Sequence, residues 1–375
     1  MVALGHLLYP FEVKLGAEIE GSDLIICRGP LSYSKPVISV PTHTKSLKDY
    51  QEPANNGNGI SYLPFDPVTE CRRKLQSALN PKLAFAYRLF AQFPFQYNIV
   101  PSLIRNRLLR MRRIDSNLRD HLIFEVCRKI LIDAFDLLGF RLQRRTPPSL
   151  VVTHDVDTEK GLRRALALKR IEDDLKVEST WFLPSDEYRI SSDIARDLAG
   201  SMIGSHDIKH DGKLVRIQRH EELVHRLKES RQKLEGIFGK RITSFRSPLL
   251  QFSRAIIAAL GESGYKFDFS APCWEPVHAP TMSGFGVESL LPFEINGVVE
   301  FPLTLFQDHQ VINVLGMSPR EGIRFWIEQA KLVRSFEGNI VILIHPDYYF
   351  AQDLQAYRHL LCSLLEVDHG LESFN

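Results

Sequence analysis

Residues that commonly bind metal ions lie in two short motifs. Asp157 ends THDVD at 153–157, and His206 and His210 lie four residues apart in SHDIKHDG. Divalent ions such as zinc bind imidazole nitrogen and carboxylate oxygen, and a catalytic site keeps three protein ligands so that one position stays open for water. Two His at i and i+4 face the same side of a helical turn. We therefore expect Asp157, His206 and His210 to bind one metal ion, although an accidental pair is the alternative in a chain with 13 His.

Asp155 and Asp157, at the end of one predicted strand, are expected to have different roles. Residues two apart in an extended strand point to the same face, and two carboxylates so close need a cation between or beside them. We expect Asp157 to bind the metal and Asp155 to accept a proton from water; the alternative is that both cap a helix beginning near Thr158. Arg246, at a predicted strand end in FRSP, could hold Asp155 ionised. Its alternative is a surface Arg in a turn.

His345 directly follows the apolar run NIVILI and is a candidate general acid for a departing amine. Asp268 or Asp347 could tune its charge, and a purely structural His is the alternative. Trp274, which ends FDFSAPCW, could line a substrate pocket or pack in the core.

These motifs follow strands in a repeating strand–loop–helix pattern that begins near residue 149. The predicted strands cover 149–155, 178–183, 202–205, 242–246, 265–269, 298–303 and 339–344. The predicted helices cover 158–175, 191–199, 219–238, 253–263, 319–336 and 352–366. Such alternation is typical of α/β proteins with a parallel sheet, in which functional residues sit at the C-terminal ends of strands.

The first 146 residues form a different region. Short strands are predicted at 24–27, 36–40 and 60–63, a loop at 52–59 and a helix at 117–138. The basic, proline-containing connector at 143–149 predicts a division into an N-terminal α+β domain, 1–146, and a catalytic domain, 147–375. The sequence does not indicate a role for the N-terminal domain.

Composition and charge exclude several partners. The net charge of +2 gives no reason to expect nucleic acid or a membrane surface, and no apolar run is long enough for a transmembrane helix. The N-terminus lacks the features of a signal peptide, and the five Cys are scattered without a CxxC pair. We therefore expect a cytoplasmic protein with reduced thiols, and leave open whether it forms a homo-oligomer.

The five motifs together resemble those of the polysaccharide deacetylase family, also called the NodB-homology family or carbohydrate esterase family four. The resemblance covers roughly residues 148–370 and implies a distorted (β/α) barrel of about seven strands. It also implies a divalent metal site, most simply Zn²⁺, although Co, Ni or Fe can take the same ligands. The implied residues are a base at Asp155, metal ligands at Asp157, His206 and His210, Arg246, Asp268, a substrate-contacting Trp274 and an acid at His345.

Two departures from the family pattern concern the substrate. The first motif is Asp-Val-Asp, which is closest to the peptidoglycan-deacetylase-like subset, and Leu249 stands where an aromatic residue is common. The backbone N–H of Leu249 could still donate to an oxyanion. We expect a metal-dependent hydrolase that removes an acetyl group from an N-acetylated amino sugar or polysaccharide. The alternatives are hydrolysis of a small non-sugar amide or cyclic imide, and a non-catalytic carbohydrate-binding protein.

Overall fold

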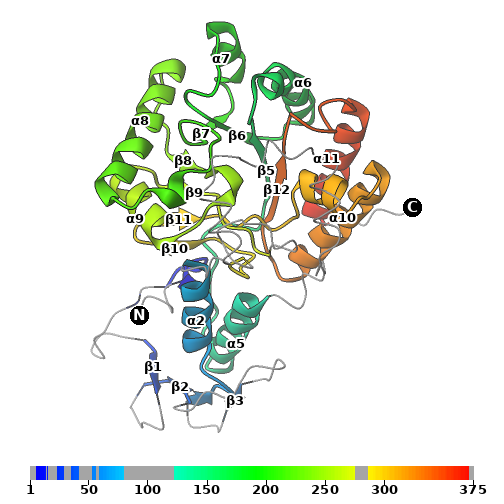
Figure 1. Ribbon diagram of the computed structural model, residues 1–375. Coiled ribbons are helices and arrows are strands. Elements are labelled where there is room, and N and C mark those ends of the chain that lie inside the picture. Colours follow the sequence, from blue (N-terminus) through cyan, green and yellow to red (C-terminus); the bar gives the residue numbers. More distant parts are fainter. Residues whose placement is uncertain are drawn as a thin grey trace.

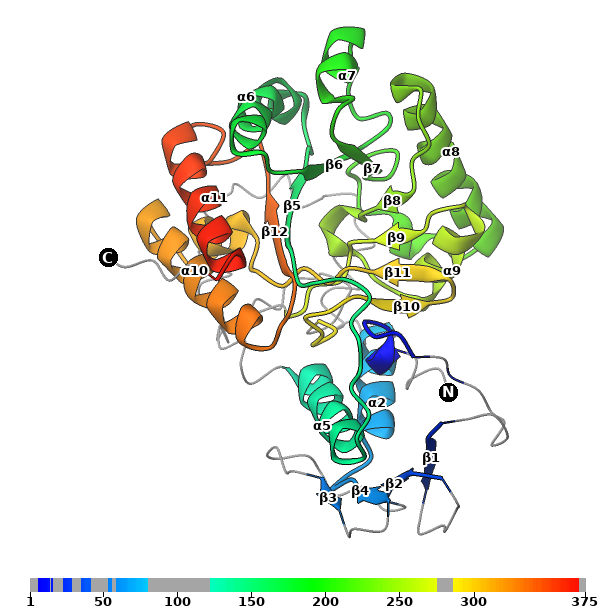
Figure 2. The same cartoon turned by 180° about the vertical axis from the view of Figure 1, so that it is seen from behind.

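The protein contains a large and a small unit. The computed structural model describes residues 6–13, 15, 23–28, 35–41, 53–55, 59–79, 122–274 and 286–370. Within these residues, an eight-stranded sheet surrounded by helices forms the large unit, and a four-stranded sheet packed with helices forms the small one. The small unit lies at one end of the large unit in both ribbon views (Figures 1 and 2). The predicted α/β barrel-like fold with an N-terminal α+β unit is confirmed.

The large sheet has the order β10-β11-β9-β8-β7-β6-β5-β12. Its strands are β5 (Leu150–Asp155), β6 (Ser179–Leu183), β7 (Met202–Ser205), β8 (Ser244–Phe245), β9 (Phe267–Asp268), β10 (Phe293–Ile295), β11 (Val298–Glu300) and β12 (Ile340–Ile344). Neighbouring strands are parallel except for β10 and β11. The seven predicted strands are therefore present, with β8, β9 and β11 shorter than predicted, and β10 is an additional edge strand.

Helices cover the outside of this sheet (Figures 1 and 2). They are α6 (Glu159–Leu175), α7 (Ser192–Leu198), α8 (His220–Phe238), α9 (Arg254–Glu262), α10 (Pro319–Ser335) and α11 (Leu354–Asp368). Shorter turns are η2 (Leu214–Arg216), η3 (Pro248–Leu250) and the π-helical η4 (His309–Val314). Local caps explain where helices begin: Thr158 accepts a hydrogen bond from the Gly161 N–H, and Ser318 forms a capping box with Glu321.

The sheet curls because the residues that follow β11 form backbone hydrogen bonds with chain segments on both sides. Leu303 donates its N–H to the Ala271 carbonyl at 2.8 Å and accepts the Cys273 N–H at 2.7 Å. Two residues later, Leu305 donates to the carbonyl of Val341 in β12 at 3.1 Å. This continuation connects the β9 side of the sheet to β12, which gives the sheet its barrel-like form.

Strand register places the motif residues at one edge of the barrel. β5 pairs in parallel with β12, so Asp155 and His345 leave the sheet side by side. β7 pairs in parallel with β8, so His206 and Arg246 do the same. The C-terminal ends of parallel strands therefore meet here, as expected for a functional site in an α/β fold.

The N-terminal unit is built on a separate small sheet. Its strands have the order β1-β2-β4-β3, and its helices pack against them. The elements are β1 (Ile25–Arg28), β2 (Val37–Val40), β3 (Ala54–Asn55), β4 (Ile60–Tyr62), α2 (Pro67–Leu79) and α5 (Ile123–Leu137). The sequence predicted a loop at 52–59. This prediction is wrong for Ala54 and Asn55, which form β3 and pair with β4. Residues 117–121 of the predicted helix lie outside the described residues.

Apolar and ionic contacts join the two units. The Phe124 ring of α5 stacks on Phe293 of β10, with 5.7 Å between ring centroids. Arg128 of α5 is buried; it pairs with Glu125 and donates to the Ser289 hydroxyl at 3.4 Å. Lys74 of α2 pairs with Glu288. The division at residues 146 and 147 stays a prediction, and these contacts determine how it should be tested.

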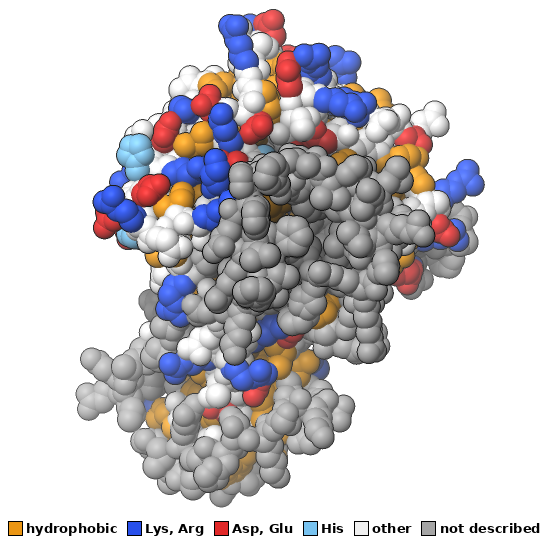
Figure 3. All heavy atoms as spheres, viewed as in Figure 1, with side chains coloured by type: hydrophobic (Ala, Val, Ile, Leu, Met, Phe, Trp, Pro, Cys, Tyr) orange, Lys and Arg blue, Asp and Glu red, His pale blue; other side chains and the backbone are white. Residues whose placement is uncertain are grey.

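The outer surface carries both signs of charge. On the face in Figure 3, Lys and Arg side chains alternate with Asp and Glu over the described helices. Among the described residues, none of the helices combines the length and apolar character needed to cross a bilayer.

Candidate metal and catalytic site

Asp157, His206 and His210 converge at the C-terminal edge of the barrel. Asp157 Oδ1 lies 3.4 Å from His206 Nε2 and 3.6 Å from His210 Nε2. One potential ligand atom from each residue lies within 4.8 Å of the others. Two imidazole nitrogens and one carboxylate oxygen are a donor set that zinc and related ions accept. The three residues could therefore hold one divalent ion, as the motif spacing indicated.

The two His reach this position without the helical turn we expected. Residues 206–212 form an irregular loop with bends at 208–211, and Asp207 has a φ of 65° and Gly212 a φ of 62°. The predicted helical turn is wrong, because a left-handed residue directly after His206 interrupts any regular helix. The loop nevertheless directs both rings to one side, with 5.4 Å between their centroids.

Hydrogen bonding prepares His206 to act as a ligand. Its Nδ1 lies 2.8 Å from the carbonyl oxygen of Arg246, so Nδ1 carries the proton and Nε2 keeps its lone pair. His206 Nε2 and Asp157 Oδ1 are both buried and have no hydrogen-bond partner among the described residues. Burial opposes ionisation of Asp157, but His210, His206 and His345 together lower its pKa. An anionic oxygen and a nitrogen lone pair left unsatisfied are what a bound cation requires.

Arg246 binds Asp155 and leaves one of its oxygens available. Arg246 Nη1 donates to Asp155 Oδ1 at 3.1 Å and to the Thr153 hydroxyl at 2.8 Å. Asp155 Oδ2 lies 3.9 Å from His206 Nε2, on the side of the proposed ligands. Because Arg246 holds Oδ1, Oδ2 is the oxygen of Asp155 placed to accept a proton there.

Contacts with Phe182 and Phe269 hold the Arg246 guanidinium in place. Arg246 is fully buried, its Nε donates to the Phe269 carbonyl at 2.9 Å, and its Cζ lies 4.6 Å from the centre of the Phe182 ring. A Cβ on Gly204 of β7 would collide with that ring. Gly204 therefore leaves room for Phe182, which supports Arg246 through a cation–π contact.

His345 is held by an acid that the sequence did not indicate. Asp308 Oδ1 lies 2.6 Å from His345 Nδ1, and Asp308 Oδ2 accepts the His345 backbone N–H at 2.9 Å. Burial opposes protonation of His345, but Asp308, followed by Asp157 and Asp155, raises its pKa to about 10. With Nδ1 bonded to Asp308, Nε2 is the nitrogen free to donate a proton. No motif marked Asp308, which lies 37 residues from His345.

Asp347 contacts the backbone at the start of α6, and a role in tuning the charge of His345 stays a prediction. It accepts hydrogen bonds from the Thr158 hydroxyl and, at 3.2 Å, from the Asp157 backbone N–H. A Cβ on Gly161 would occupy the space of its carboxylate. Asp347 therefore holds the Asp157 backbone at the start of α6, and the acid bonded to His345 is Asp308.

Asp268 lies in a buried acidic pair below the site. It is opposite Glu300 in the register of β9 and β11, and both side chains are fully buried. Burial raises the pKa of Asp268 to about 6, and burial together with Asp268 raises the pKa of Glu300. Asp268 Oδ1 accepts from the Ser270 hydroxyl, which in turn accepts the Ser247 N–H at 2.9 Å. A catalytic role for Asp268 stays a prediction, and its partners place it next to the strand that carries Arg246.

The two predicted substrate-contacting residues differ in their surroundings. Leu249 has a φ of 59° and Leu250 a φ of 51°, so two consecutive non-glycine residues are left-handed at the strand end after Arg246. Such conformations are costly and concentrate at functional sites. The Trp274 side chain is only 6% exposed and belongs to the main apolar core. Its role as a substrate contact stays a prediction, while its position matches the core alternative.

Glu187 and Tyr188, in the loop after β6, are further neighbours of the ligands. Glu187 Oε2 accepts the His210 backbone N–H at 3.1 Å, and the Tyr188 hydroxyl donates to the Val156 carbonyl at 2.6 Å. Burial and the nearby Asp157 carboxylate raise the pKa of Tyr188. Their segment follows a predicted strand, which was the one available signal that it faces the site.

Comparison with known proteins agrees with this arrangement. Residues 144–267 match the polysaccharide deacetylase family. The resemblance indicated by the motifs is thus confirmed for the segment with Asp155, the proposed metal ligands and Arg246. The matched segment ends before Asp268 and His345. The Asp-Val-Asp subset stays a prediction.

Several solved structures are also similar. A candidate polysaccharide deacetylase from Mycobacterium smegmatis is 19% identical with a TM-score of 0.48, over 58% of this chain and 84% of that chain. A family 4 carbohydrate esterase from Streptomyces lividans, in complex with acetate, is 14% identical with a TM-score of 0.38, over 59% and 88%. A family 4 pseudoenzyme from Bacillus anthracis is 14% identical with a TM-score of 0.39, over 59% and 65%. No curated protein matches the chain.

Proposed function

We propose that the protein is a metal-dependent deacetylase that hydrolyses the acetamido group of an N-acetylated amino sugar. The observation that carries the proposal is the convergence of Asp157, His206 and His210 beside an Asp155 held by Arg246. The polysaccharide deacetylase match over residues 144–267 supports amide hydrolysis and an acetylated sugar as substrate.

The unsatisfied donor atoms support a metal cofactor. Asp157 Oδ1, His206 Nε2 and His210 Nε2 would hold the ion. A bound divalent ion would supply Lewis acidity, which polarises the acetyl carbonyl and lowers the pKa of a water molecule. Zn²⁺ is our first choice because the ligands are two imidazoles and a carboxylate, and Co, Ni or Fe also fit them.

The remaining groups would move the protons. Asp155 Oδ2 would accept a proton from the attacking water while Arg246 holds Oδ1. The water oxygen forms a bond to the acetyl carbon, and the carbon–nitrogen bond breaks. His345 Nε2 would donate a proton to the departing amine, because Asp308 keeps the ring protonated. The Leu249 backbone N–H is our proposed donor to the developing oxyanion.

An acetate-release assay tests the proposal. Purified protein would be incubated with N-acetylated sugars, nucleotide sugars, oligosaccharides and small cyclic amides, before and after treatment with a chelator. We expect acetate from an acetamido sugar, loss of release after chelation and recovery with Zn²⁺. Ring opening of a small cyclic amide without acetate release would favour the other amidohydrolase function. Sugar binding without any turnover in the metal-loaded protein would indicate a carbohydrate-binding protein.

A further inference from the structure

Both proposed His ligands are followed by an Asp, and both Asp bind the same arginine. Arg226 of α8 donates from Nε to Asp207 Oδ1 at 3.0 Å and from Nη2 to Asp207 Oδ2 at 2.8 Å. The same Nη2 donates to Asp211 Oδ1 at 2.9 Å. Because Asp207 follows His206 and Asp211 follows His210, one guanidinium is connected to both ends of the ligand loop.

The loop needs such support because it lacks regular structure. It has neither the hydrogen bonds of a helix nor those of a strand between His206 and Gly212. Its inner contacts include Ser185 N–H to the Asp207 carbonyl at 3.0 Å and Asp186 N–H to the Ile208 carbonyl at 2.9 Å. These bonds hold the backbone near His206. The Asp211 side chain connects the other end of the loop to α8 through Arg226.

The chemistry of this contact requires an arginine. Asp207 is fully buried, and the Arg226 side chain is 19% exposed, so the pair is shielded from solvent. A planar guanidinium can bind one carboxylate with two nitrogens and reach a second carboxylate with the same group. A lysine ammonium would keep the charge but lose this fixed geometry. Glu187, which accepts the His210 N–H, is exposed and holds the loop from another side.

We propose that Arg226, through Asp207 and Asp211, is a positioning residue that sets the spacing of the two His ligands and thereby the affinity for the metal. The inference rests on the metal site of the proposed function. Second contacts that orient ligand residues commonly change metal affinity about 10- to 100-fold when removed. Arg226 contacts neither substrate nor the reacting atoms in this arrangement, so its effect acts through the ligand loop.

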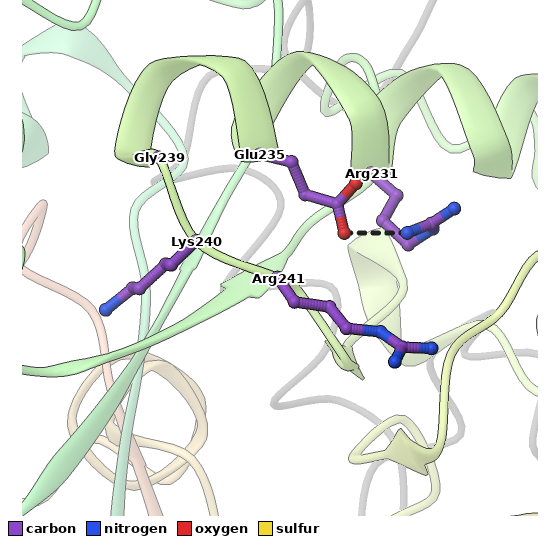
Figure 4. A pocket seen from close by; sticks show the side chains of 5 residues that line it. All are labelled: Arg231, Glu235, Gly239, Lys240 and Arg241. Carbon is purple, nitrogen blue, oxygen red and sulfur yellow. Dashed lines mark hydrogen bonds and ion pairs between the residues drawn. The ribbon is translucent and has the colours of Figure 1, made fainter.

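The test compares Arg226 with a matched arginine on the same helix. Arg231 pairs with Glu235 at 2.6 Å and donates to the Ser263 carbonyl at 2.9 Å, and its side chain is 18% exposed. Figure 4 shows this pair at a surface depression of about 550 Å³ lined also by Gly239, Lys240 and Arg241. The depression lies at the C-terminal end of α8, which precedes β8, whereas the ligands follow the C-terminal ends of strands. Arg231→Met therefore removes a similarly buried arginine whose partners, Glu235 and Ser263, lie outside the ligand loop.

Zn²⁺ affinity of the full chain would be measured by competition with a chromophoric chelator. The absorption spectrum of the Co²⁺-loaded protein would report ligand geometry. We expect Arg226→Met to weaken Zn²⁺ binding about 10- to 100-fold and to alter the Co²⁺ spectrum. Arg226→Lys should give an intermediate loss, and Arg231→Met should bind like the wild type.

If Arg226→Met does not fold, Asp211→Ala keeps the buried Asp207–Arg226 pair and removes the contacts of the Asp211 side chain with Arg226 and Lys213 at the His210 end of the loop. That variant should also weaken Zn²⁺ binding and alter the Co²⁺ spectrum. Wild-type affinity and spectrum in a folded Arg226→Met or Asp211→Ala variant would overturn the inference while leaving the metal site itself intact. A wild-type protein that binds neither ion would overturn both the inference and the proposed function.

Discussion

The Asp308 carboxylate lies 2.6 Å from Nδ1 of His345 and also accepts the His345 backbone N–H. One acid therefore fixes both the ring and the main chain of the proposed proton donor. It also accepts the His309 N–H at 2.7 Å, which ties the same carboxylate to the start of η4.

Asp308→Asn should shift the pH dependence of turnover. His345 acts as an acid only when protonated, so activity falls as pH rises through its pKa. Removing the Asp308 charge lowers that pKa, because Asp308 is the largest contribution that raises it. We therefore expect the alkaline limb of kcat/KM to move to lower pH and turnover near neutral pH to fall about 10²-fold. Asp353→Asn, at the N-cap of α11, is the control. An alkaline limb that stays in place in Asp308→Asn would remove this tuning role.

Asp155→Asn and Asp157→Asn should separate catalysis from metal binding. The two residues share one strand end, but Arg246 holds Asp155 while Asp157 faces the two His. Asp155→Asn should cut turnover about 10²–10⁴-fold with metal content near wild type. Asp157→Asn should lose metal as well as activity, because it removes an anionic ligand. Elemental analysis and acetate release measure the two effects. Equal metal loss in both variants would contradict the division of labour.

Arg128→Met should destabilise the protein strongly. Its buried guanidinium pairs with Glu125 and donates to the Leu7 carbonyl at 3.0 Å. Removing it leaves the Glu125 carboxylate buried without its cation, which typically costs about 3–5 kcal/mol in the free energy of unfolding. The double variant Glu125→Leu, Arg128→Met removes both charges and should recover part of the loss. Denaturant unfolding measures the difference. A fully stable single variant would show that water or another group compensates Glu125.

A fragment of residues 147–375 tests the division into domains. All the site residues lie within it, so we expect it to fold and to bind metal. We also expect a lower melting temperature than the full chain, because Phe293 loses Phe124 and the barrel core loses Leu75 and Leu79. Phe293→Ser in the fragment should improve its solubility without changing metal affinity. Fragments that stay insoluble or metal-free in both forms would mean that the two units share one folding core.

Sequence patterns predicted the features of the site that depend on residues close together in the chain. The apolar run before His345 indicated β12, and the apolar run before Asp155 indicated β5, which ends at Asp155 with Asp157 two residues beyond it. The HxxxH pair converged as predicted, but for a different local reason. Asp207 takes a left-handed conformation after β7, so the helical rule that suggested convergence does not describe the loop.

Contacts between distant segments could not be predicted in this way. Asp308 reaches His345 only because the continuation of β11 runs beside β12, and no periodicity marks that path. Arg226 similarly looked like one charged residue among many on an amphipathic helix. β10 was missed because a three-residue antiparallel edge has too few residues to show alternation. Asp268 followed a predicted strand and was considered as a group that tunes His345, but no sequence pattern indicated that it lies opposite Glu300.

The pairing of β5 with β12 has a consequence for how the protein is made. The His154 side chain contacts a carbonyl of β12 that lies 190 residues later in the chain. During synthesis, β5 is therefore made long before β12, the strand with which it pairs. Until then, one edge of β5 lacks its strand partner, and such an edge is a template for aggregation. The proposed base and acid meet only when these strands join. A nascent chain stalled before β12 should therefore depend on chaperones and be inactive.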